Sequence, residues 1–273
     1  MQELTLKELQ QASLDILKDV HEFCVANKIK YSIAYGTLIG ALRHKGFIPW
    51  DDDVDIVMPR PDFERFCKTY HSDQGMRLIY YGNDKSALAA FARVCEFKKT
   101  YYQTERPWTI QQSGVWIDIF PLDGVINQEE YSRRYKRLKR ISPIVYKFRR
   151  QNHHVVPLDS LWSKSKTIIA KVIGFGGMLP ALLLKQIVSI MTKYNYDECD
   201  TYGQMSCLDD GPIVFSKEDF KNTVLLDFED TKLCAMNGYD KVLRQVYGDY
   251  MQLPPENKRA PKQYWIHFLW KNS

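Results

Sequence analysis

Apolar side chains recur at helical spacing over residues 4–28, so that one face of this segment is apolar and the other is polar. Thr5 and Glu8 stand three positions apart at its start, which is the spacing of a capping box. The pattern predicts an amphipathic helix that begins close to Thr5.

A strand, a helix and a second strand are expected next. The apolar run at residues 31–35 predicts a short strand, and Gly36 with Thr37 opens a helical segment that reaches Arg43. The motif VDIVM at residues 54–58 alternates as a half-buried strand does. Further strands are expected at residues 77–81, 88–97 and 115–120. This alternation predicts an α/β (α+β) fold, a mixed sheet with flanking helices.

The middle of the chain has a different character. Residues 129–150 predict a strongly basic helix, and residues 167–191 are apolar but interrupted by lysine, glycine and proline, so a membrane span is not expected. This helical subdomain either packs as buried helices with a solvated basic face or contacts an anionic membrane. We therefore expect three parts, which are a catalytic core (1–125), the helical subdomain (126–205) and a C-terminal segment that completes the active site (206–273).

Composition narrows the class of protein. The chain has 273 residues, 45% of them hydrophobic, which is enough for one large domain or a domain with an appendage. Its net charge of +5 suits an anionic partner such as a nucleotide, a phosphoglycan or a lipid surface, and nucleic acid is not implied. The six cysteines are scattered and no export signal is visible, so a cytoplasmic protein is predicted.

Four aspartates occupy five positions in the motif DDDVD at residues 51–55. Asp53 and Asp55 point to the same side of an extended chain, and two such carboxylates repel each other unless a cation lies between them. Mg²⁺, with Mn²⁺ as an alternative, prefers such oxygen ligands. Asp118 lies in an apolar strand where a carboxylate needs a partner, so it is the expected third ligand. Asp51 and Asp52 fit either a turn or the site.

Gly36 and Thr37 lie between a predicted strand and a helix, where free N–H groups and the threonine hydroxyl suit a phosphate. A strand, Gly-Thr and a helix, then a strand with Asp-x-Asp and a later strand with one Asp, follow the order of the nucleotidyltransferase fold. Each part of that order has a use in phosphoryl or nucleotidyl transfer.

Three longer motifs carry a family resemblance: YGTLIGALRHKGFIPWDDDVDI, VWIDIFPLDG and VYGDYMQLPPENKR. They resemble the LicD family of phosphocholine transferases, which are related to the fukutin-type ribitol-phosphate transferases. The resemblance implies a nucleotidyltransferase-like domain and Mg²⁺-dependent phosphotransferase activity, with CDP-choline as donor. It also implies a sugar hydroxyl as acceptor, such as that of N-acetylgalactosamine, in a lipid-linked teichoic acid or lipooligosaccharide precursor. Arg259 is followed by Ala260 where many relatives have a histidine, so any role of that histidine is in doubt here.

We assign provisional roles on this basis. Asp53, Asp55 and Asp118 are expected to be catalytic and to bind the metal, with Asp118 as general base and Asp52 or His44 as alternatives. Positive charge or phosphate contacts at the donor are expected from Gly36, Thr37, Arg43, Arg93, Lys98 and Arg259, the last together with Lys258 after Pro254-Pro255. A choline headgroup is best held by aromatic faces. The candidates are Tyr101, Tyr102, Trp108 and Trp116, with Trp265 and Trp270 behind them.

Other functions remain open from sequence. A glycosyltransferase also uses Asp-x-Asp to bind a nucleotide sugar, although the upstream Gly-Thr and Asp118 argue against it. A nucleotide-binding module without catalysis would usually have lost one carboxylate. Ribitol- or glycerol-phosphate transfer from a CDP-alditol is the nearest alternative. A lipid-linked acceptor would also explain a peripheral contact of residues 129–191 with the inner face of the cytoplasmic membrane.

Overall fold

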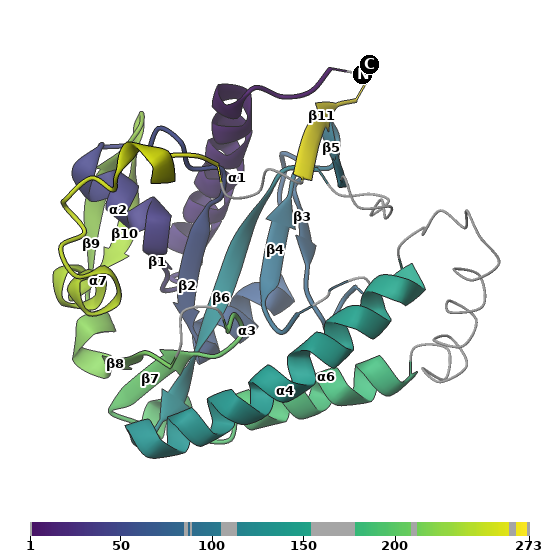
Figure 1. Ribbon diagram of the computed structural model, residues 1–273, viewed down its shortest axis with the longest axis vertical. Coiled ribbons are helices and arrows are strands. Elements are labelled where there is room, and N and C mark those ends of the chain that lie inside the picture. Colours follow the sequence, from purple (N-terminus) through teal and green to yellow (C-terminus); the bar gives the residue numbers. More distant parts are fainter. Residues whose placement is uncertain are drawn as a thin grey trace.

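A mixed sheet forms the centre of the molecule, a computed structural model (Figure 1). Its strand order is β1-β2-β6-β4-β3, and β7 and β8 extend it from β6. The bounds are β1 Ser32–Ile33, β2 Asp55–Pro59, β3 Arg77–Ile79, β4 Ala92–Cys95, β6 Trp116–Val125, β7 Thr201–Gln204 and β8 Val214–Ser216. The structure describes residues 2–84, 87, 89–104, 114–153, 178–208, 212–261 and 266–271. The expected α/β fold is confirmed.

Helices α1 (Leu6–Ala26), α2 (Tyr35–Arg43) and α3 (Arg60–Thr69) accompany the N-terminal strands. Helix α1 begins with the predicted capping box, in which Thr5 and Glu8 exchange hydrogen bonds. Its apolar face, with Leu17 and Val20 fully buried, packs into the same core cluster as strands β2 and β6. The expected helix over residues 4–28 is therefore confirmed in place and in orientation.

The middle segment forms an antiparallel helical pair, α4 (Gln128–His153) and α6 (Met178–Met191), drawn along one side of the sheet in Figure 1. Leu138, Val145, Leu184 and Ile187 form the core between them. The basic helix predicted at residues 129–150 is confirmed, and of the apolar stretch the described part is α6. Among the described residues, no helix is both long and apolar enough to cross a membrane.

The C-terminal part packs against elements of the N-terminal half, with β9 beside α2 and β10 beside β1. It contains the hairpin β9 (Thr223–Phe228) and β10 (Thr231–Met236), helix α7 (Tyr239–Tyr247) and strand β11 (Ile266–Trp270), which pairs with β5 (Thr100–Thr104). In the part of the chain that the structure describes, short 3-10 helices lie at Tyr196–Glu198, Lys217–Phe220 and Glu256–Lys258. Strand β11 also bonds to the N-terminus, because Leu4 N–H donates to the Phe268 carbonyl. The two chain ends therefore lie together (Figure 1).

Some boundaries differ from the sequence prediction. The strand expected at residues 31–35 is only Ser32–Ile33, because Tyr35 already begins α2. The strand expected at residues 115–120 continues to Val125, since β7 pairs with its second half. The six cysteines are free thiols in the structure. The division into three parts stays a prediction. Strands β7 and β8, which lie outside residues 1–125, belong to the same sheet as the strands of that first part.

Candidate active site

The aspartate-rich loop before β2 forms a compact acidic group. One carboxylate oxygen from each of Asp51, Asp52 and Asp53 lies within 4.8 Å of the others, close enough to share one metal ion. Asp51 is buried, at 7% exposure, and reaches back to the start of α2. A Cβ atom at Gly36 would lie 2.5 Å from its Oδ2 atom, so glycine is required there for this close approach.

Asp55 is held in place by the chain just upstream. Its carbonyl accepts a hydrogen bond from Ala34 N–H at 3.0 Å, and its own N–H donates to Thr37 Oγ1 at 3.0 Å. Thr37 is buried, at 4% exposure. The threonine hydroxyl therefore positions Asp55, and the phosphate-binding role expected for Gly36 and Thr37 stays a prediction.

Asp118 lies beside Asp55, because β2 and β6 run parallel with these two residues in register. Arg93 on β4 binds it, with 2.6 Å between Arg93 Nε and Asp118 Oδ1. Burial acts to lower the pKa of the Arg93 guanidinium, but the attraction of Asp118 outweighs this and the pKa is raised. Arg93 also lies over the Trp116 ring, at 4.5 Å from its centroid. Of the expected metal ligands, Asp55 and Asp118 are thus brought together.

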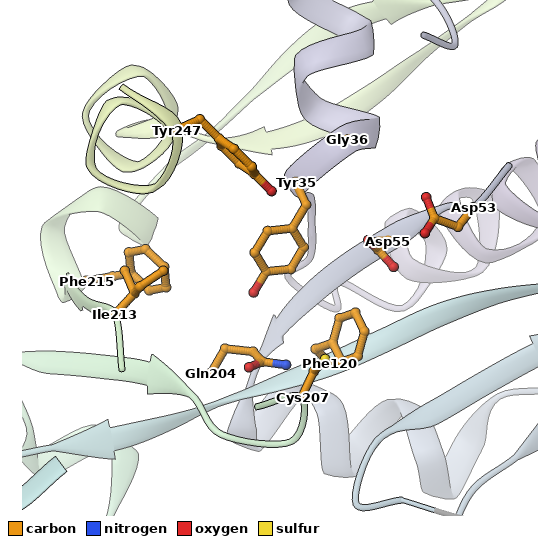
Figure 2. Close-up of a pocket in the computed structure, with 10 residues that line it drawn as sticks. All are labelled: Tyr35, Gly36, Asp53, Asp55, Phe120, Gln204, Cys207, Ile213, Phe215 and Tyr247. Atoms are coloured by element: carbon orange, nitrogen blue, oxygen red, sulfur yellow. The ribbon is translucent and has the colours of Figure 1, made fainter. Parts of the chain in front are cut away.

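A cavity of ≈ 150 Å³, here the Asp55 cavity, opens beside these carboxylates. Figure 2 shows Asp53 and Asp55 on one side of it and aromatic side chains from several elements around the rest. Its lining is Tyr35, Gly36, Asp53, Asp55, Phe120, Gln204, Cys207, Ile213, Phe215 and Tyr247. Acidic groups therefore face an aromatic wall that the sequence analysis did not name.

Tyr35 joins the two sides of the Asp55 cavity. Its backbone is left-handed, with φ at +49°, which is uncommon for a bulky residue. Its ring meets that of Phe120 edge-on, with 6.2 Å between the centroids. Burial raises the pKa of the Tyr35 phenol well above its usual value, and the Asp55 carboxylate adds to the shift. Tyr35 therefore stays a neutral phenol beside the carboxylates.

A second cavity of ≈ 450 Å³, the Arg43 cavity, lies on the other side of Gly36 and Tyr247, which line both. Its walls come from α2, the loop around Trp50 and the C-terminal segment; besides the shared pair they are Ile39, Arg43, Ile48, Trp50, Asp51, Asp249, Tyr250, Gln252, Leu253, Pro254, Pro255, Lys258 and Ala260. Burial lowers the pKa of Arg43, and the charge of nearby Arg259 lowers it further. Arg43 and Lys258 thus bring positive charge to this cavity and Asp51 and Asp249 negative charge, and the donor contacts expected of the two cations stay a prediction.

Arg43 and Arg259 are themselves held by backbone carbonyls. Arg43 Nη1 donates to the Tyr250 carbonyl at 2.9 Å, and Arg259 Nε donates to the Pro254 carbonyl at 2.8 Å. His44 Nε2 accepts from Arg43 Nε at 2.9 Å, and its pKa is lowered, first by burial and then by Arg43. His44 is therefore a neutral acceptor packed near Trp50.

The aromatic residues expected to bind choline lie elsewhere. Tyr102 and Trp116 are buried in the core, where their ring centroids are 5.0 Å apart, and Tyr101 is half-buried on β5. Lys98 and Trp270 line a separate cavity beside α1. Trp108 and Trp265 fall outside the described residues. None of the described members of this set lines the Asp55 cavity or the Arg43 cavity, and their choline-binding role stays a prediction.

One signal in the sequence pointed to the aromatic wall. Phe120 follows Asp118 by two positions, so on a strand its side chain shares the face of that carboxylate. Phe215 and Tyr247 gave no such signal, because only the folded C-terminal part brings them to the cavity. Sequence spacing alone could not have identified them.

Comparison with known proteins agrees with this arrangement. Residues 28–168 match the family model described as LicD/FKTN/FKRP, nucleotidyltransferase domain. The lipopolysaccharide cholinephosphotransferase LicD of Haemophilus influenzae (strain ATCC 51907 / DSM 11121 / KW20 / Rd) is 32% identical over 279 aligned positions, which cover 96% of this chain and 97% of that protein.

Two shorter matches fall on uncharacterised proteins of Rickettsia prowazekii (strain Madrid E) and Rickettsia typhi (strain ATCC VR-144 / Wilmington). Each is 53% identical over 47 residues, 17% of this chain, and these cover 18% and 15% of the two relatives. The family model and the full-length relative together decide the assignment. The chain belongs to the LicD family of transferases.

Proposed function

We propose that this protein transfers phosphocholine from CDP-choline to a sugar hydroxyl of a cell-surface glycan precursor, such as a lipopolysaccharide or a teichoic acid. The observation that carries the proposal is the Asp55 cavity, where carboxylates face aromatic rings. A relative that covers nearly the whole chain is a lipopolysaccharide cholinephosphotransferase by name, which supports the choice of donor group and acceptor. N-acetylgalactosamine is the acceptor sugar that we expect.

The acidic residues fit a divalent cation. Asp51, Asp52 and Asp53 offer only oxygen ligands within one short loop, and Asp55 and Asp118 lie in register on adjacent strands behind it. Mg²⁺ is the proposed ion, since it prefers carboxylate oxygens and bridges phosphate groups, and Mn²⁺ would suit the same ligands. When bound, it would neutralise charge on the transferred phosphoryl group and on the departing CMP.

The chain's own residues prepare the reaction. In the proposed step an acceptor hydroxyl oxygen bonds to the phosphorus of the choline phosphate, the bond from that phosphorus to CMP breaks, and the hydroxyl proton passes to a carboxylate. We propose Asp118 as that carboxylate, because it lies next to Asp55 and Arg93 fixes its orientation. Thr37 keeps Asp55 at the cavity wall. Positioning and charge therefore supply most of the catalysis.

The α4–α6 pair supports a peripheral place at the cytoplasmic face of a membrane, where a lipid-linked precursor would be met. Among the α4 residues whose side chains the structure describes, five cations are exposed: Arg133, Lys136, Arg137, Lys139 and Arg140. Ile144 on α4 and Met178 and Leu182 on α6 are large apolar side chains that are also exposed, at 45%, 58% and 56%. Basic and apolar groups exposed on one helical pair suit anionic lipid headgroups. Salt-sensitive sedimentation with phosphatidylglycerol vesicles is the expected result.

A donor screen tests the proposed function. We would titrate CDP-choline, CDP-ribitol, CDP-glycerol and UDP-N-acetylgalactosamine into the protein with Mg²⁺ by calorimetry. We expect CDP-choline to bind most tightly and a double variant, Asp53→Asn with Asp55→Asn, to lose at least about tenfold in affinity and nearly all transfer.

The same screen separates the alternatives. Preference for a CDP-alditol would leave the metal site in place and change the donor, and preference for the UDP-sugar would overturn the proposal. The matched control is the double variant Asp227→Asn with Asp230→Asn, which removes the same number of charges from exposed aspartates at the β9–β10 hairpin, away from both cavities.

A further inference from the structure

The Asp55 cavity and the Arg43 cavity meet at Gly36 and Tyr247, which line both. We propose that one CDP-choline molecule spans the two, with its trimethylammonium group against the aromatic wall of the Asp55 cavity and its CMP half in the Arg43 cavity. This inference rests on the proposed function and deepens it, because it assigns an orientation to the donor and names the residues that select choline.

The Asp55 cavity has the chemistry that a quaternary ammonium needs. Such a group cannot donate a hydrogen bond, and aromatic faces and nearby negative charge are what attract it. Phe120, Phe215 and Tyr247 supply rings from three different elements, and the Tyr35 ring lies among them. Asp53 and Asp55 add negative charge on the opposite side. At ≈ 150 Å³ the cavity suits a small headgroup and is too small for a nucleoside as well.

The Arg43 cavity offers cationic side chains to the phosphate of the CMP half. Arg43 and Lys258 line it, and the Arg259 guanidinium lies over the Trp50 ring at 5.6 Å from the centroid. Arginine and lysine form strong, charge-assisted hydrogen bonds with phosphate oxygens. Asp51 and Asp249 line the same cavity, and the proposed cation at the acidic loop would neutralise Asp51 and leave Arg43 and Lys258 to a phosphate. The larger volume, ≈ 450 Å³, leaves room for a ribose and a base.

The acidic loop lies where the two cavities join. Asp51 lines the Arg43 cavity and Asp53 lines the Asp55 cavity, although only Asp52 separates them in sequence. A pyrophosphate that runs from one cavity to the other therefore passes this loop. Gly36 belongs to the same junction, and any larger residue there would press on Asp51. In this orientation the bond between the choline phosphate and CMP lies beside the carboxylates of the acidic loop. The choline end lies within the Asp55 cavity.

Fragment binding tests this orientation. We would measure the affinities of CDP-choline, phosphocholine and CMP with Mg²⁺ by calorimetry for the unaltered protein, for Phe215→Leu and for Lys258→Gln. We expect Phe215→Leu to weaken phosphocholine and CDP-choline about tenfold and to leave CMP unchanged. Lys258→Gln should weaken CMP and CDP-choline about tenfold and leave phosphocholine unchanged. Each variant's unaffected fragment shows that it is folded, and Tyr247→Leu is a second aromatic variant should Phe215→Leu not fold.

The opposite pattern, or an equal loss of affinity for both fragments in both variants, would overturn the inference. A Lys258→Gln variant that bound CMP normally would also overturn it, and would leave the Arg43 cavity to the acceptor sugar. In each case, CDP-choline binding by the unaltered protein would still support the proposed function. If the unaltered protein bound no CDP-choline at all, the proposed function itself would fall.

Discussion

The two ends of strand β6 each carry an aspartate paired with an arginine, and the pairs differ in their access to solvent. Asp123, near the end of the strand, binds Arg60 through two bonds of 2.6 and 2.7 Å, and their side chains are 1% and 7% exposed. Asp118, near its start, binds Arg93, and their side chains are 13% and 31% exposed. The same pair of residue types is thus closed at one end and open at the other.

We propose that this difference separates a structural ion pair from a functional one. Both oxygens of Asp123 are bound by Arg60, so that pair can only hold α3 against the sheet. Asp118 stands beside Asp55, which lines the Asp55 cavity, and keeps 13% of its side chain exposed. A buried charge that is fully bonded belongs to the fold, whereas a partly exposed one beside a second carboxylate is available for chemistry.

Breaking the closed pair should have the largest effect. Arg60→Met leaves Asp123 as an uncompensated buried charge, which costs about 3–5 kcal/mol of the free energy of unfolding. Urea denaturation followed by circular dichroism measures it. The double variant Arg60→Met with Asp123→Leu should recover most of the loss, because an apolar pair of similar volume replaces the ion pair. A double variant as unstable as the single one would show that the charges themselves hold the fold.

Changing the open pair should affect catalysis more than stability. Asp118→Asn keeps the shape of the side chain but removes its charge, and we expect transfer to fall about 100-fold, close to 2.7 kcal/mol. The free energy of unfolding should change by about 1 kcal/mol or less, since the pair is partly exposed. Steady-state transfer and urea denaturation on the same preparation measure both. A large loss of stability with little loss of transfer would place Asp118 with Asp123 as a structural residue.

The smallest effect on transfer is expected from Thr37 on helix α2, which supports Asp55. Thr37→Val removes the buried acceptor of the Asp55 N–H while keeping the volume of the side chain, which costs about 1–2 kcal/mol. Transfer should fall about tenfold as Asp55 loses its support. Thr37→Ser is the matched control, because it keeps the hydroxyl and should restore transfer. Equal loss in both variants would contradict this, because Thr37→Ser keeps the hydroxyl and the hydroxyl alone would then not be enough to support Asp55.

Local signals in the sequence located the first half of the fold and of the site. The capping box of Thr5 and Glu8, the helical face of residues 4–28 and the alternation of VDIVM depend on near neighbours, and the structure contains all three elements. Asp55 and Asp118 were also expected to act together. Their register across β2 and β6 is the structural basis of that expectation.

Long-range contacts account for what the sequence did not reveal. Phe215 and Tyr247 reach the Asp55 cavity only because β8 joins the sheet through β7 and α7 packs beside α2 and β8. Arg60 and Asp123, 63 positions apart, form a buried pair that no spacing rule identifies. Tyr102 and Trp116 looked suitable for choline by their place in the sequence, but the pairing of β5 with β11 buries them together with Phe268.

The left-handed backbone of Tyr35 has a consequence for how this protein changes over generations. A bulky residue in that conformation stores about 1–3 kcal/mol of strain, which glycine or asparagine at the same position would relieve. Most random substitutions lower the stability of a protein, whereas glycine or asparagine at position 35 would remove backbone strain. The strained tyrosine is therefore retained only while selection acts on the function of its side chain. In a lineage that no longer needed the reaction, position 35 would be among the first to drift.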